Sequence, residues 1–202
     1  MKRSRLRNSS WAIALALCAA AAPALAACGS DAPTDLPTRT TPVPAYSFDP
    51  GSGTTAGARR GTDGLEFVPW VDIEVSALGF CDAGGDGLRN SHTVGIFDTE
   101  TEELVTPTVV VDSESVLDGF YRYESITPVV LKAGRSYKLA GHSESPFDPA
   151  GKGGGDDWEP ELRYVRHSES PGNFQFPGTP KPSDWMMPNF KFRPVPASSP
   201  AP

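Results

Sequence analysis

Residues 78–98, LGFCDAGGDGLRNSHTVGIFD, decide how the rest of the chain is organised. Apolar and polar residues alternate in the run that leads into this stretch, residues 73–77, and Val94 and Ile96 resume the alternation near its end. A period of two is typical of a strand with one buried face. Between the two runs lies a loop rich in glycine and aspartate, residues 82–90. The stretch is therefore predicted to form strand, loop and strand, with the other segments packed around it.

Shorter segments of the same kind follow along the chain, at 104–111, 120–126, 129–131, 137–140, 162–167, 174–176 and 189–192. Clusters of Gly, Pro and Asp separate them, and no segment combines a helical period with capping residues. The pattern predicts an all-β fold of about seven to nine short antiparallel strands in two sheets. We expect a β-sandwich of the jelly-roll or immunoglobulin-like type.

The N-terminal segment, residues 1–27, has the composition of an export signal. Four basic residues precede residue 8, and an apolar run extends from 11 to 27. The run ends in Leu-Ala-Ala directly before Cys28, which is typical of a bacterial lipoprotein signal that is cleaved before the cysteine. Cys28 would then carry lipid, palmitate included; the alternative is an ordinary signal cut after Ala27. By resemblance to the sorting rule of enteric lipoproteins, Gly29 after the cysteine favours the outer membrane, so we expect a lipid-anchored envelope protein.

Composition divides the remainder into three parts. Residues 28–64 are rich in Pro, Thr, Gly and Ser and predict a disordered tether, in which residues 46–48 are the one apolar spot and a candidate edge strand. Residues 65–193 hold the predicted strands and form the predicted β-sandwich domain. Residues 194–202 are predicted to be a disordered tail.

The mature chain is acidic and has one cysteine left. Removing residues 1–27 leaves 14 basic against 25 acidic residues, a formal charge of −11. This balance disfavours nucleic acid and suits divalent cations or neutral partners, such as an envelope polysaccharide or protein. With Cys18 removed and Cys28 lipidated, Cys81 alone remains, so no internal disulfide is expected and stability must come from a packed core.

Several separated segments together resemble a known kind of module: 75–82 with 86–88 and 92–98, then 119–128, then 131–137, and the closing 188–192. Their order and spacing are similar to those of a β-sandwich module of unknown function in bacterial exported proteins, including ones with sorting signals such as PEP-CTERM. The resemblance covers about residues 65–193. It implies a β-sandwich fold and an extracytoplasmic setting, and it implies no activity.

The 82–90 loop has the spacing of the first part of a calcium-binding loop. Asp82, Asp86 and Asn90 stand at positions one, five and nine, where such loops supply oxygen ligands. Gly84 at position three adds no side chain, and Thr93 stands where a bidentate carboxylate is needed. We therefore expect weak calcium binding, relevant at extracellular concentrations; the alternative is a strand connection shaped by Asx turns.

The histidines suggest structural roles and one metal hypothesis. His92 precedes a strand, so we expect it to hold the loop closed by hydrogen bonding to Asp82 or Asp86. The pentapeptide His-Ser-Glu-Ser-Pro occurs twice, at 142–146 and 167–171, each near the end of a predicted strand. If those strands pair, the two His–Glu sets would meet at one rim and suit zinc or another transition metal. The alternative is turn chemistry.

Aromatic residues in the long loops suggest a second kind of site. Trp158, Trp185 and Tyr164 lie in or beside loops that also carry carboxylates, and exposed rings of this kind bind sugar faces. The alternative is that the indoles fill the open ends of the sandwich.

The sequence thus supports a non-catalytic binding or structural module first, a carbohydrate-binding module second, and an envelope hydrolase last. Neither Gly-x-Ser-x-Gly nor His-Glu-x-x-His occurs.

Overall fold

A computed structural model describes residues 33–47, 56–57, 60–144, 148–152, 158–182 and 185–196, without the side chains of 56–57 and 149–152. The predictions for the signal segment, for Cys28 and for residues 197–202 lie outside these ranges.

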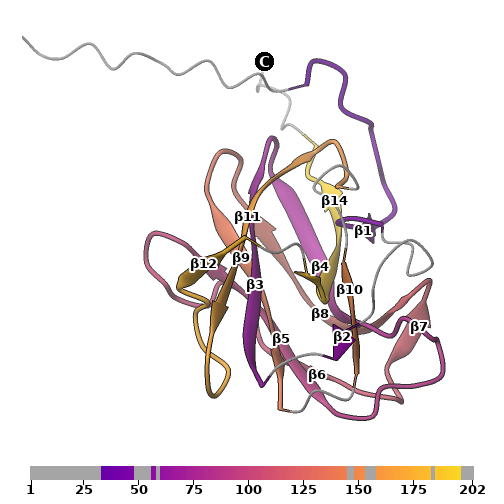
Figure 1. Ribbon diagram of the computed structural model, residues 1–202. Coiled ribbons are helices and arrows are strands. Elements are labelled where there is room, and N and C mark those ends of the chain that lie inside the picture. Colours follow the sequence, from indigo (N-terminus) through magenta and orange to yellow (C-terminus); the bar gives the residue numbers. More distant parts are fainter. Residues whose placement is uncertain are drawn as a thin grey trace, which may run out of the picture. The chain divides into compact units, whose positions relative to one another are not determined.

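The described chain forms strands that pair antiparallel throughout (Figure 1). A five-stranded sheet has the order β1-β14-β4-β8-β7, with β1 (Val43–Pro44), β14 (Pro188–Pro194), β4 (Ile73–Cys81), β8 (Tyr121–Leu131) and β7 (Val116–Asp118). A six-stranded sheet has the order β12-β11-β3-β9-β5-β6, with β12 (Thr179–Lys181), β11 (Leu162–Ser170), β3 (Gly61–Pro69), β9 (Tyr137–Ser143), β5 (His92–Asp98) and β6 (Val109–Val111). A small third sheet joins β13 (Trp185–Met186), β10 (Pro149–Lys152) and β2 (Ala56–Gly57). The all-β, two-sheet prediction is confirmed, with more strands than expected.

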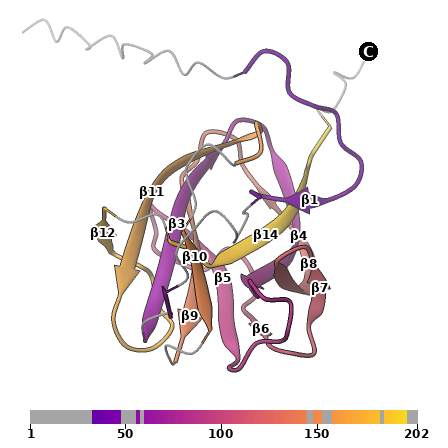
Figure 2. The same cartoon turned by 45° about the vertical axis from the view of Figure 1, so that its right-hand side comes forward.

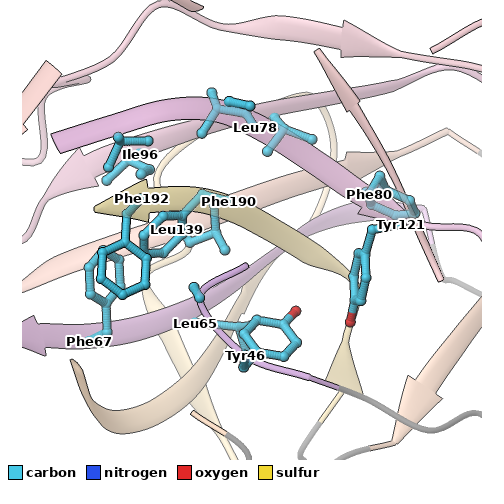
Figure 3. Packing of buried hydrophobic residues seen from close by; sticks show 14 of the residues in the cluster. Tyr46, Leu65, Phe67, Leu78, Phe80, Ile96, Tyr121, Leu139, Phe190 and Phe192 are labelled. Atoms are coloured by element: carbon cyan, nitrogen blue, oxygen red, sulfur yellow. The ribbon is translucent and has the colours of Figure 1, made fainter. Parts of the chain in front are cut away.

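The core lies between the two larger sheets, whose strands occupy opposite sides of it (Figures 1 and 2). Alternate residues of the long strands enter it, as a period of two requires, for example Leu65 and Phe67 of β3 and Ile73 and Val75 of β4. Phe67 of the six-stranded sheet meets Phe190 of the five-stranded sheet with ring centroids 5.0 Å apart. Figure 3 shows these rings with Leu78, Ile96 and other buried side chains of the cluster.

The stretch quoted first links the two layers. Its first strand, β4, lies in the five-stranded sheet and its second, β5, in the six-stranded sheet, so the 82–90 loop crosses from one sheet to the other. Phe80 before the loop and His92 after it stack with ring centroids 3.7 Å apart and planes 5° from parallel. The stacked pair therefore closes one of the connections between the two layers.

The folded part begins earlier than residue 65. β3 starts at Gly61, and β1 pairs with β14 as an edge strand, where Pro44 is tolerated because an edge needs no amide donor on its outer side. Tyr46 is 1% exposed and packs in the core. The prediction of a disordered tether over 28–64 is therefore wrong at these positions. A segment rich in Pro, Thr, Gly and Ser can still contain a few residues that pair with a strand or pack in the core, and its composition does not reveal them. At the other end β14 reaches Pro194, within a residue of the predicted boundary.

No helix in the described part of the chain has the length and apolarity that crossing a membrane requires.

Candidate functional site

Asp82 begins the crossing loop and is held by protein groups. Its carboxylate is buried and accepts hydrogen bonds from Arg122 Nε at 2.7 Å and from the Gly87 backbone N–H at 3.1 Å. Arg122 also donates to the carbonyl oxygens of Ser113 and Ser115. A guanidinium therefore balances the charge that a calcium ion would balance in the predicted site.

Asn90 at the end of the loop is bound to a different carboxylate. Asp148 accepts from the backbone N–H groups of Arg89 and Asn90, at 2.7 and 3.0 Å, and from Asn90 Nδ2 at 3.2 Å. Burial alone would raise the pKa of Asp148, but these hydrogen bonds and one from His92 lower it below 3.8. The ionised Asp148 carboxylate therefore holds the end of the loop in place through hydrogen bonds.

The predicted calcium ligands are thus directed to different partners. Asp82 faces Arg122, Asn90 faces Asp148, and Asp86 is exposed at the tip. The partners lie 40 and 58 residues away in sequence, so the loop alone gave no sign of them. Calcium binding stays a prediction, and in the structure two of its three ligands, Asp82 and Asn90, are bound by other protein groups.

His92 is fully buried and joins the same network. Its Nε2 lies 3.0 Å from Asp148 Oδ2, and the Ser143 hydroxyl lies 3.2 Å from Nδ1. Burial lowers its pKa below 6.5 despite the nearby carboxylate. Nδ1 also lies 3.2 Å from the His142 carbonyl oxygen, so a neutral ring that donates from Nε2 to Asp148 can accept from the Ser143 hydroxyl but cannot donate to that carbonyl. The environment is the structural one we expected, but the partner is Asp148 and not Asp82 or Asp86.

The three aromatic residues predicted to bind sugar all pack against the core. Trp158 is buried and lies against Tyr164, Phe67 and Tyr46, with centroid distances of 5.6, 5.9 and 4.9 Å. Trp185 and Tyr164 are half-buried. The prediction of an exposed platform is therefore wrong for Trp158, since its ring faces are already covered.

One group of histidine and carboxylates does converge. Asp63, His167 and Glu169 each offer a ligating atom, and these atoms lie within 4.8 Å of one another. His167 Nε2 is 3.1 Å from Asp63 Oδ1. Asp63 of β3 pairs with Glu169 of β11, and His167 pairs with Leu65, so the three side chains share one face of the sheet. Leu65 belongs to the core, which places this face inward.

The two His-Ser-Glu-Ser-Pro segments have different surroundings. β9 and β11 flank β3 on opposite sides and do not pair with each other, so the shared rim site that we considered does not form. In the first segment His142 contacts Glu144 at 3.0 Å, and Arg60 lies 3.4 Å from Glu144. In the second, β3 supplies Asp63. We missed Asp63 because it lay in the supposed tether, although its two-residue spacing from Leu65 and Phe67 extends the strand pattern.

Comparison with known proteins adds no assignment. No protein family model matches the chain, and no curated protein shows significant similarity to it. The resemblance to modules of exported proteins therefore stays a prediction from the sequence.

Proposed function

We propose that the protein is an exported β-sandwich, anchored in the cell envelope through lipid on Cys28, that acts as a non-catalytic binding or structural module. The observation that carries the proposal is the basic start and apolar run that end in Leu-Ala-Ala before Cys28. The β-sandwich, which needs no disulfide for its core, suits a compact domain displayed outside the cytoplasm. The acidic mature chain favours cationic or neutral partners over nucleic acid.

Mass spectrometry of the membrane-extracted protein tests the anchor. We expect a mature N-terminus at Cys28 with a diacylglycerol group on its sulfur, and we expect Cys28→Ala to stop both cleavage at that point and lipid attachment. Cys18→Ala is the matched control, because that cysteine lies inside the signal and should leave processing unchanged. A mature N-terminus other than residue 28, or an unmodified thiol there, would contradict the proposal.

A further inference from the structure

We propose that Asp63, His167 and Glu169 form a binding site for one divalent transition-metal ion of the zinc class. The ligand set comes from two neighbouring strands: β3 supplies one carboxylate, and β11 supplies the imidazole and the second carboxylate. Imidazole nitrogen with carboxylate oxygen is the combination that such ions take in proteins.

The geometry of the group is close to that of a bound site. An ion with four tetrahedral bonds of about 2.1 Å holds its ligand atoms about 3.4 Å apart. His167 Nε2 and Asp63 Oδ1 already satisfy this at 3.1 Å, and the widest separation in the group is within 4.8 Å. Closing the group therefore needs the most distant pair of ligand atoms to approach by up to about 1.4 Å. The Glu169 side chain is 28% exposed and can supply that shift.

The burial and charge of the group also favour a cation. The His167 side chain has no solvent exposure and Asp63 has 10%, so two carboxylates converge beside a buried imidazole. Lys181 Nζ lies 3.5 Å from Glu169 Oε2, but its side chain is 41% exposed and can turn to solvent when an ion binds. Three protein ligands leave further coordination positions for water or for a donor from a partner.

The sister segment supplies a matched control within the same sheet. His142 and Glu144 repeat the His-Ser-Glu spacing at the end of β9, yet in the described residues only the Asp63, His167 and Glu169 group brings three ligating atoms together. Glu144→Gln and Glu169→Gln are therefore the same chemical change in the same local sequence, with only the second removing a proposed ligand.

The test is calorimetric titration of the purified protein, free of any affinity tag, with zinc chloride, together with melting curves in zinc and in EDTA. We expect one zinc ion per chain and a rise in Tm of several degrees, on the order of 5 °C, when zinc exceeds its Kd about 100-fold. Glu169→Gln should weaken zinc binding at least about 10-fold, and Glu144→Gln should leave it unchanged. Cobalt(II) should give visible absorption bands that Glu169→Gln alters.

Three outcomes would overturn the proposal: no zinc binding by the wild-type protein, binding that Glu169→Gln leaves intact, or binding that Glu144→Gln removes. Because Glu169 is half-buried, its variant should fold, and the melting curve in EDTA checks that it does. Asp63→Asn removes another proposed ligand and should also weaken zinc binding. The site does not depend on lipid at Cys28, so failure of either proposal leaves the other standing.

Discussion

Asp82 and Arg122 form an ion pair whose members are both largely buried, with side-chain exposures of 3% and 13%. Removing one partner of such a pair leaves the other charged and without compensation, which costs more than the pair itself contributes. At the scale of single residues, the stability of the crossing loop therefore depends on the ion pair between Asp82 and Arg122.

Asp82→Ala should lower the free energy of unfolding by about 3 kcal/mol, because Arg122 loses its counter-charge. Asp86→Ala, at the exposed tip of the same loop, should change it by no more than about 0.5 kcal/mol. Urea denaturation of both variants measures the difference. Equal losses for the two would contradict the assignment of Asp82 to Arg122.

The calcium prediction is tested with the same Asp86 variant. If calcium binds the loop, about 1 mM of the ion should raise the Tm of the wild-type protein, and Asp86→Ala should remove the rise. Arg122 already compensates Asp82, so the rise should be small. A wild-type Tm that does not respond to calcium would eliminate this role for the loop.

His92 should make stability depend on pH. Its folded-state pKa is below 6.5, so below that pH the unfolded chain binds a proton that the folded chain does not. Stability should therefore fall as the pH drops from about 6.5, and Asp148 should add a second loss below about 3.8, as the pH falls toward its lowered pKa. Free energies of unfolding between about pH 7.5 and pH 5 should fall less steeply for His92→Gln than for the wild type. Parallel curves would show that another group causes the dependence.

At the scale of elements, β4 packs closely against its neighbour β8 because one of its residues has no side chain. A Cβ on Gly79 would lie 2.5 Å from Tyr123 Cδ1 and 2.7 Å from the Arg122 carbonyl oxygen. Tyr123 is 4% exposed, so its ring has little room to move. The glycine therefore allows the tyrosine ring to cover the strand.

Gly79→Ala should destabilise the fold by about 1 to 3 kcal/mol through this overlap. Gly178→Ala is the control, because a Cβ there meets no atom within 4 Å. Thermal and urea unfolding of the two variants would separate the effects. A Gly79 variant as stable as the Gly178 variant would mean that Tyr123 and the backbone of β8 can move aside.

Sequence patterns predicted elements better than they predicted partners. The alternation around Ile73 and Val94 identified β4 and β5, because a half-buried strand imposes its period locally. The same reasoning could not find Asp148, which lies 56 residues from His92 and follows no strand pattern. It suggested an edge strand at 46–48, whereas β1 is Val43–Pro44, since two residues paired at a sheet edge leave no period to detect. The convergence of Asp63 with His167 likewise depends on which strands become neighbours, 104 residues apart.

At the scale of the whole molecule, the beginning and the end of the folded chain support each other. β14 lies between β1 and β4, so the C-terminal strand joins an N-terminal edge strand to the sheet. Tyr46, next to β1, donates its hydroxyl hydrogen bond to the Pro188 carbonyl oxygen. Arg39 pairs with Glu159 and Glu161.

Tyr46→Ala should therefore cost about 3 to 5 kcal/mol of stability, as loss of a large buried ring does. Tyr46→Phe keeps the ring and should cost about 1 kcal/mol for the lost hydrogen bond. Urea midpoints measure both. If the Tyr46→Ala protein is as stable as the wild type, the segment around Tyr46 does not contribute to the stability of the fold.

The docking of Arg39 limits how far the folded part can stand from a lipid on Cys28. A fully extended tether of residues 28–64 would span up to roughly 130 Å. Because Arg39 is bound to the folded part, only the eleven peptide steps from Cys28 to Arg39 remain, and these span at most about 40 Å. An anchored protein would then contact only molecules that lie in the same bilayer or close to its surface.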